Sequence, residues 1–207
     1  MPRTSNRGKP PIFTNAGRRF PPEVLSDAEV RALMDACGEG LPSCARNRAL
    51  IAVLYRGGLR VSEALALYPK DLDPATGAVR VLWGKGGRAR TIGLDPGAFR
   101  LVGEWMRLRA GTGLDARYPL FCTPRGGAVS SSYIRRLLNR LGEQAGIQKR
   151  VHPHGLRHTH AAQLRAEGVD IGIISKQLGH RSIATTARYL DHIAPWAVVE
   201  AMRGREW

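Results

Sequence analysis

Two short segments with alternating side chains interrupt a sequence that otherwise has helical spacing. Residues 79–83 (VRVLW) and 89–93 (ARTIG) are rich in β-branched or aromatic residues, which favour strands. The five residues between them, GKGGR, combine glycine with basic side chains and are typical of a turn. The sequence therefore predicts one small antiparallel hairpin and leaves helices to build most of the core.

Helical segments lie on both sides of this hairpin and are bounded by capping residues and glycines. Ser26 and Glu29 form a capping box, and Gly38 ends the helix that they start. Further helices are expected at about 45–56, from 61, at 96–109, from the serines at 130–132 to about 146, and at 154–167, 170–178 and 182–190, with a helical tail around 194–203. The predicted fold class is α+β, mainly α-helical with a small antiparallel β-sheet.

The charge of the chain is strongly positive. Lysine and arginine number 32 against 17 acidic residues, which gives a net charge of +15. The first twenty residues hold five basic side chains and no acid, so residues 1–22 are expected to form a flexible basic arm, and the rest still carries +10. A polyanion such as nucleic acid is the expected partner, with a solvated basic face as the alternative.

The cysteines and apolar runs constrain the cellular setting. Cys37, Cys44 and Cys122 are odd in number and widely spaced, which argues against a disulfide framework and against a zinc site. The longest apolar run, Ala49–Tyr55, is too short to span a bilayer. We expect no membrane partner and a cytoplasmic protein associated with the nucleoid.

Three segments hold residues suited to binding a phosphate. Arg60 follows the glycine pair at 57–58, where its guanidinium can project from a helix start, although pairing with Glu63 would also explain it. His154 and Arg157 are three residues apart and share one helix face. Tyr189 follows the helix break at 178–180 by nine residues; taken alone, it is more typical of a packing residue.

The order of these parts adds a second line of inference. The segments RGGLRVSEAL, GKGGRAR, HPHGLRHTHA and LGHRSIATTARYL together resemble the tyrosine recombinase, or phage integrase, family along residues 25–195. The resemblance implies that family's catalytic-domain fold over residues 23–207. Most family members have a separate N-terminal core-binding domain, whereas here only the basic arm is expected before Leu25, so we expect either a naturally short recombinase or a fragment. It implies a catalytic set of Arg60, Lys85, His154, Arg157, His180 and Tyr189, with Glu63 orienting its neighbours.

The chemistry of phosphodiester cleavage suits these residue types. Attack by a tyrosine hydroxyl adds negative charge to the nonbridging oxygens, which two arginines, Arg60 and Arg157, could clamp. His154 would accept the nucleophile's proton, and His180 would donate to the phosphate. Lys85 would protonate the leaving 5′ oxygen. The bond energy would remain in a 3′-phosphotyrosyl link, so neither ATP nor another cofactor is expected.

Other basic residues receive supporting roles. His158 is expected to support the active site, and a metal site at His154 and His158 is rejected because no carboxylate or cysteine lies among the histidines and Arg157 would repel a cation. The glycines around Lys85 lack the Ser or Thr of a nucleotide-binding loop. The expected DNA contacts are Arg88 and Arg90 of the hairpin and Arg135 and Arg136, with Arg140, of the serine-capped helix.

The expected function is site-specific recombination by breaking and rejoining double-stranded DNA in integration, excision or inversion, as in mobile elements. The resemblance implies a homotetramer on DNA formed from a monomer in solution, and accessory DNA-bending proteins as further partners. The tail would dock on a neighbouring protomer or pack on its own core through Ile193, Trp196, Val198, Val199 and Met202. A type IB topoisomerase and a non-catalytic DNA-binding regulator are the alternatives.

Overall fold

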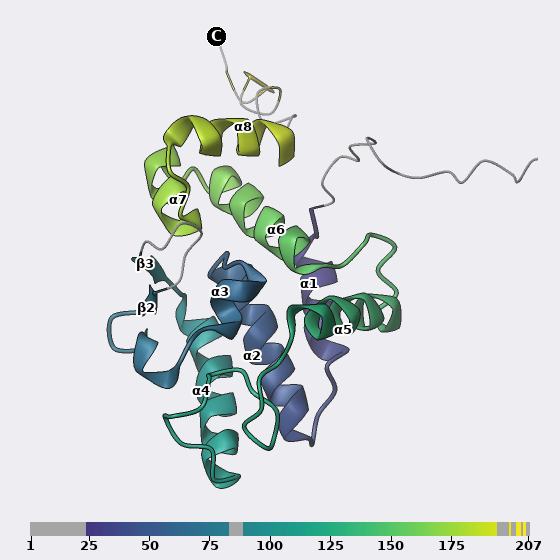
Figure 1. Cartoon of the computed structure of the whole chain (residues 1–207). Coiled ribbons are helices and arrows are strands. Elements are labelled where there is room, and N and C mark those ends of the chain that lie inside the picture. The colour runs from purple at the N-terminus through teal and green to yellow at the C-terminus, as the bar shows by residue number, and fades with distance from the viewer. Residues whose placement is uncertain (1–23, 83–88, 194–198, 200–201, 204, 206–207) are drawn as a thin grey trace, which may run out of the picture.

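The computed structural model describes residues 24–82, 89–193, 199, 202–203 and 205, and helices make up most of this part of the chain (Figure 1). The predicted fold class is confirmed. The helices are α1 (Asp27–Asp35), α2 (Pro42–Arg56), α3 (Val61–Leu65), α4 (Pro96–Gly111), α5 (Ser131–Gln144), α6 (Pro153–Ala166), α7 (Ile171–Leu178) and α8 (Ile183–Ile193), and a 3₁₀ helix spans Pro69–Asp71.

The sheet is antiparallel and has the order β1 (Leu72–Asp73), β2 (Ala78–Val81), β3 (Arg90–Gly93) within the described residues. Val79 pairs with Ile92 and Val81 with Arg90, so the expected hairpin is confirmed. Strand β1 was not expected, because two residues are too short to show alternation. The turn between β2 and β3, at residues 83–88, lies outside the described part of the chain.

Local sequence signals explain where most helices begin. Ser26 caps α1 through the expected capping box, in which the Ser26 hydroxyl accepts from the backbone N–H of Glu29 and the Glu29 carboxylate accepts from that of Ser26. Ser130 caps α5 by accepting from the N–H of Tyr133. Helix α2 begins at Pro42, three residues before the predicted start. Proline suits a first helical turn because the N–H it lacks would have no partner there.

The larger hydrophobic cluster is centred on α2, which packs against α4 and α6. Leu50, Ile51, Val53 and Leu54 of α2 are all buried, so this helix presents apolar side chains on nearly every side. The buried valines of β2 and Ile92 of β3 cover the same cluster from the sheet. The rigid core of the molecule therefore supports the turn that follows α2.

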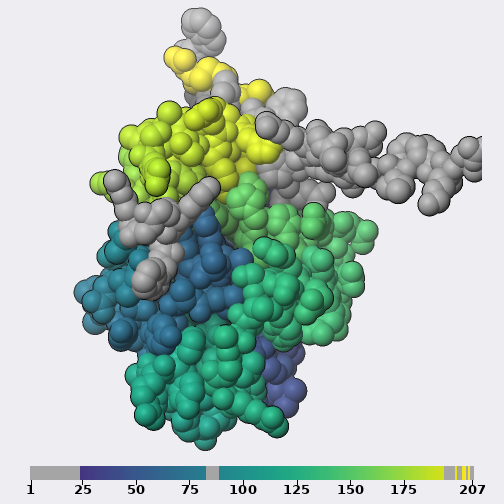
Figure 2. Space-filling view, viewed as in Figure 1, coloured from purple at the N-terminus to yellow at the C-terminus, as the bar shows by residue number. Residues whose placement is uncertain are grey.

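A smaller cluster joins α6, α7 and α8 through Ala161, Ile174, Leu178, Leu190 and Ile193. Helix α6 belongs to both clusters, because Leu156 packs in the larger one. Figure 2 shows α7 and α8 gathered at the end of the molecule opposite α4. No helix in the described residues is long and apolar enough to cross a membrane.

Candidate active site

The turn between α2 and α3 positions Arg60. Helix α2 ends at Arg56, and Gly58 has a φ of 61°, a backbone conformation that glycine adopts without strain. A Cβ atom at Gly58 would also lie 2.5 Å from Cδ2 of His160. The chain can therefore turn sharply here only with glycine, and the turn leaves Arg60 at the N-cap of α3.

Glu63 is the buried anion of the site. Its carboxylate accepts hydrogen bonds from the backbone N–H of Arg60 (3.0 Å), from Arg60 Nη1 (2.8 Å), and from Nη1 and Nη2 of Arg90 (3.0 and 2.9 Å). Burial alone would raise the pKa of Glu63, but the hydrogen bonds from Arg90 and Arg60 lower it to about 2. Glu63 is therefore ionised at any working pH and fixes one edge of the Arg60 guanidinium.

Arg157 joins two separate segments from its place on α6. Its side chain is buried, with Nη1 donating to the carbonyl of Gly58 and Nη2 to that of Leu178, both at 2.6 Å. Burial and the nearby charge of Arg60 lower the pKa of Arg157 to about 10. The guanidinium therefore stays charged at neutral pH and is held in one plane by backbone groups.

His180 follows the end of α7 and faces Arg157. Gly179, with a φ of 65°, ends α7, and Nε2 of His180 then lies 3.3 Å from Nη2 of Arg157. Nδ1 lies 2.9 Å from Oγ1 of Thr186, whose side chain is fully buried. Burial and the neighbouring arginines lower the pKa of His180 to about 4, so the ring is neutral at pH 7.

Tyr189 lies on α8 among histidine rings. Its ring stacks on His158 with centroids 5.0 Å apart and meets the His180 ring edge-on at 5.3 Å. The Oη atom is buried and has no hydrogen-bond partner among the described residues. Burial raises the pKa of Tyr189 to about 12, although the charge of Arg157 opposes that shift. The phenol is therefore protonated at neutral pH and would need a proton acceptor to act as a nucleophile.

Two histidines of α6 are candidates to accept the proton of the Tyr189 hydroxyl. His154 is exposed, its ring centroid lies 6.3 Å from that of Tyr189, and desolvation and Arg157 lower its pKa. His158 is buried, and burial and His154 lower its pKa to about 3. Both rings are therefore mainly neutral at pH 7 and can accept a proton.

Within the described residues, no three His, Cys, Asp or Glu side chains lie close enough together to hold a metal ion.

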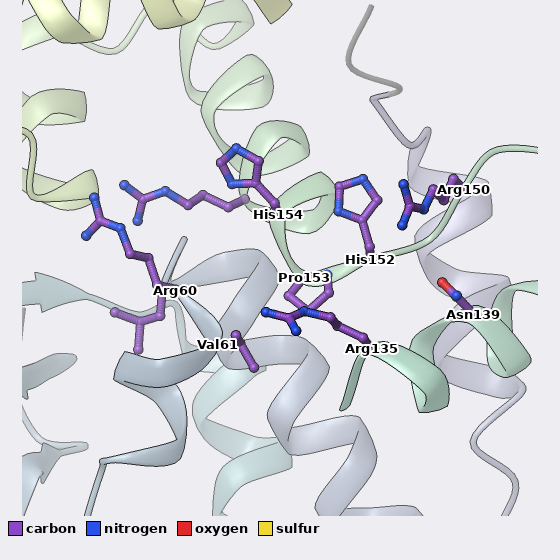
Figure 3. Close-up of a pocket in the computed structure, with 10 residues that line it drawn as sticks. Arg60, Val61, Arg135, Asn139, Arg150, His152, Pro153 and His154 are labelled. Atoms are coloured by element: carbon purple, nitrogen blue, oxygen red, sulfur yellow. The ribbon is translucent and has the colours of Figure 1, made fainter. Parts of the chain in front are cut away.

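A pocket of about 260 Å³ opens beside these residues (Figure 3). Arg60 and His154 lie at one end of it, and Arg150 and His152 lie towards the other. Arginine and histidine dominate its polar lining, so an anion is the ligand that its charge favours. The lining residues are Leu59, Arg60, Val61, Arg135, Asn139, Arg150, His152, Pro153, His154 and Arg157.

The other residues singled out from the sequence lie in different places. Arg135 of α5 lines the pocket, whereas Arg136 is exposed on α5 and is not among the lining residues. Arg90 is held by Glu63 rather than projecting into solvent. Lys85 and Arg88 lie outside the described residues.

Several polar residues of the site were not predicted from the sequence. His152 is the N-cap of α6 and accepts from the N–H of Gly155 at 3.1 Å, a role that the following Pro153 could have signalled. Thr186 gave no sequence signal, because its contact with His180 depends on the angle between α7 and α8. Asn139 likewise reaches the pocket through the packing of α5, and Arg150 reaches it from the segment between α5 and α6.

Arg60 and Arg157 can bind a tetrahedral anion between them. Tyr189 lies close to histidine rings that are neutral at pH 7. Arg60 and Arg157 line one pocket, and each is held by hydrogen bonds, Arg60 to Glu63 and Arg157 to the carbonyl of Gly58. Fixed cationic donors stabilise charge that develops during a reaction without reorganising first. The chemistry that this favours is nucleophilic displacement at a phosphate.

Comparison with known proteins identifies relatives. The sequence model of the phage integrase family matches residues 23–194. Tyrosine recombinase XerD of Ralstonia nicotianae is 37% identical over 179 residues, which cover 84% of this chain and 56% of the relative. The chain spans little more than half the length of the curated relatives it matches.

Solved structures agree with this family. The crystal structure of XerA recombinase has a TM-score of 0.78 and 33% identity, and the match covers 93% of this chain and 69% of XerA. XerH recombinase, bound to a palindromic difH substrate in a post-cleavage complex, has a TM-score of 0.72 and 28% identity, covering 89% of this chain and 54% of XerH.

Proposed function

Because the chain belongs to the phage integrase family of tyrosine recombinases, we propose that it breaks and rejoins DNA strands through a covalent 3′-phosphotyrosyl intermediate at Tyr189. One observation carries the proposal: Arg60, Arg157 and His154 line a single basic pocket, and the Tyr189 ring lies between the rings of His158 and His180. The recombinases XerD and XerA, which this chain resembles, support the same reaction class.

The two arginines would bind the scissile phosphate. A guanidinium has five N–H donors, so the bonds to Glu63 and to the backbone carbonyls orient Arg60 and Arg157 and still leave donors for phosphate oxygens. Charge on those oxygens grows as the tyrosine attacks, so these contacts strengthen towards the transition state. His180 would add a further hydrogen bond to the phosphate.

Two proton transfers would complete the step. Tyr189 must lose its proton, and His154, which is neutral at pH 7, is the candidate acceptor. The leaving 5′ oxygen must gain one, and we assign this role to Lys85, which the sequence puts between β2 and β3. A 5′ hydroxyl of another strand would then attack the phosphotyrosine, break the bond to Tyr189 and restore the phosphodiester.

The substrate would be double-stranded DNA. The net charge of +15 suits binding along a polyanionic backbone, and the exposed Arg136 and the pocket residue Arg135 on α5 are proposed phosphate contacts, as is Arg88. The XerH relative was solved with a palindromic substrate, and a palindrome presents two equivalent half-sites. We propose that copies of this chain occupy such half-sites, two sites pairing in a homotetramer, and that accessory DNA-bending proteins can join it.

The covalent intermediate supplies the direct test. We would incubate the protein with a nicked suicide DNA that carries its recombination site, and separate protein–DNA adducts under denaturing conditions. Adduct should form with EDTA present and map to Tyr189, and Tyr189→Phe should abolish it. Arg60→Ala and Arg157→Ala should each slow cleavage by about 10²-fold or more, as expected for loss of one transition-state donor.

Tyr68, the N-cap residue of the 3₁₀ helix, provides a matched control. Tyr68→Phe removes the same hydroxyl group and should leave the adduct intact. An adduct that persists in Tyr189→Phe would contradict the assignment. Relaxation of plasmids that lack any specific site would instead indicate a topoisomerase.

A further inference from the structure

Resting on the proposed function, we infer that Arg90 is a positioning residue that acts through Glu63 and thereby holds Arg60 and the His180 segment in register, rather than a DNA contact. The observation behind this inference is a bidentate ion pair between strand β3 and helix α3. Nη1 and Nη2 of Arg90 donate to the two separate oxygens of Glu63, at 3.0 and 2.9 Å.

The four donors on Glu63 divide evenly between two arginines. Oε1 accepts from Arg60 Nη1 and Arg90 Nη1, and Oε2 accepts from the Arg60 backbone N–H and Arg90 Nη2. Arg60 contributes only one side-chain nitrogen, so Arg90 is the partner whose planar fork matches the carboxylate. The orientation of the carboxylate, and through it that of Arg60, therefore depends on Arg90.

Arg90 also touches the segment that carries His180. A Cβ atom at Gly179 would lie 2.7 Å from Cζ and Nε of Arg90, so the guanidinium packs directly on the glycine backbone. The residue after Gly179 is His180, whose Nε2 contacts Arg157. One side chain of the sheet thus lies between the carboxylate that orients Arg60 and the backbone that leads to His180.

Arg90 is more buried than the arginines proposed to bind DNA. The Arg90 side chain is 14% exposed, whereas Arg135 and Arg136 on α5 are exposed residues. Both of its terminal nitrogens donate to Glu63, whose own side chain is 1% exposed. Each terminal nitrogen keeps a second N–H, but the side chain is mostly buried, so a DNA phosphate has little access to those hydrogens.

Arg90 starts β3 directly after the segment that contains Lys85 and pairs with Val81, the last residue of β2. Anchoring Arg90 on Glu63 therefore fixes one end of the loop that carries the proposed general acid to the helix that carries Arg60. Removing this anchor should affect the chemical step more than the binding of DNA.

The test compares Arg90→Ala with wild type in single-turnover cleavage of the suicide DNA at saturating protein, together with DNA affinity across a salt series. We expect cleavage to slow by about 10- to 100-fold, while affinity stays within about two-fold and the salt dependence is unchanged. In the Glu63→Gln background, Arg90→Ala should add little, because both changes remove the same interaction.

A pH profile supplies a readout that a merely structural role would not move. Arg90 helps to depress the Glu63 pKa, so its removal raises that pKa, and the ionised carboxylate is lost as pH falls through the new value. Arg90→Ala should therefore lose cleavage rate on the acid side at a higher pH than wild type does. Arg90→Lys keeps the charge without the fork and should recover only part of the rate.

Arg80 provides the matched control. It is an exposed arginine on the adjacent strand β2, and Nη2 donates to the carbonyl of Lys70 at 2.7 Å. Arg80→Ala removes one charge from the same sheet and should keep the saturated cleavage rate. If Arg90→Ala proves unstable in thermal unfolding, Arg90→Lys against Arg80→Lys gives the same comparison.

Three outcomes would overturn the inference. If wild type forms the adduct and Arg90→Ala cleaves at the wild-type rate, the inference about Arg90 is wrong and the proposed function still stands. A second outcome is that Arg90→Ala weakens DNA binding, reduces the slope of log affinity against log salt by about one, and leaves the saturated cleavage rate unchanged. That result would make Arg90 a phosphate contact. No adduct with wild type would contradict the proposed function itself, and the inference with it.

Discussion

Thr186 gives His180 a partner that suits either tautomer of the ring. Arg157 can only donate, so Nε2 of His180 accepts in the described arrangement, and Nδ1 carries the proton towards Thr186 Oγ1. Binding a phosphate oxygen requires the opposite tautomer, with the proton on Nε2. A hydroxyl can accept in the first case and donate in the second, so Thr186 keeps the ring oriented through the change.

We predict that Thr186→Val slows strand cleavage by about 5-fold, because the variant keeps the side-chain shape and removes one buried hydrogen bond, which contributes about 1 kcal/mol. Thr186→Ser restores the hydroxyl and should recover most of the rate. Thr185→Val is the control, since Thr185 is exposed on the same helix. Single-turnover cleavage measures all three, and equal rates for the Val and Ser variants would refute the role.

Several residue-level assignments were within reach of sequence, and others were not. Glu63 could be assigned next to Arg60 because a spacing of three on a helix fixes the contact. Arg90 could be named as a basic residue of the hairpin, but its partner lies 27 positions earlier in the chain, and no local pattern encodes that distance. The burial of the Tyr189 hydroxyl likewise depends on how α8 packs against α6.

Among the elements, the turn between α2 and α3 is under a strong steric demand. Gly58 has a positive φ, its carbonyl accepts from Arg157, and its Cα faces the ring of His160. Both ring nitrogens of His160 are buried without a hydrogen-bond partner among the described residues, and burial lowers its pKa to about 4. The neutral ring therefore acts as a packing surface for the turn.

We predict that Gly58→Ala destabilises the fold by about 2–4 kcal/mol, from backbone strain of 1–2 kcal/mol plus crowding against His160 and Leu178. Gly40→Ala separates the two causes, because Gly40 has a φ of 83° and nothing within 4 Å of the added Cβ. Urea unfolding of both variants measures the difference. An equal loss of stability in both would show that crowding at Gly58 contributes nothing.

The helices whose ends have local sequence signals could be predicted from the sequence. Caps at Ser26 and Ser130, and the glycines after α6 and α7, marked helix ends because their backbone requirements are local. Strand β1 escaped prediction because it exists only through pairing with β2. The packing order, with α2 at the centre, follows from long-range burial that periodicity alone does not specify.

For the whole molecule, the proposed assembly of copies on DNA can be tested through the C-terminal end of the chain. The end of α8 is part of the fold itself, because Ile193 is buried with Leu190 in the smaller cluster. Beyond it, Val199 and Met202 are exposed apolar residues, whereas Trp196 and Val198 lie outside the described part of the chain. The tail after Ile193 is therefore the segment with which to test the proposed contact between protomers.

We predict that a chain ending after residue 193 folds and binds one DNA site but no longer forms the tetramer on two-site DNA, because the contact between protomers is lost. Sedimentation velocity with and without two-site DNA measures this, and the intact chain should change from monomer to tetramer only with DNA. Replacing Val199 and Met202 by serine gives a full-length comparison. Unchanged assembly of the shortened chain would exclude this role of the tail.

Helix α6 carries His154 and Arg157 and is also the helix that both hydrophobic clusters share. Arg157 is bonded to the carbonyl of Leu178, and the side chain of Leu178 fills the smaller cluster. A change of volume in that cluster would therefore shift Arg157, a group proposed to bind the phosphate. Along α6, natural selection cannot adjust thermal stability and reaction rate independently, so accepted substitutions there should occur in compensating pairs.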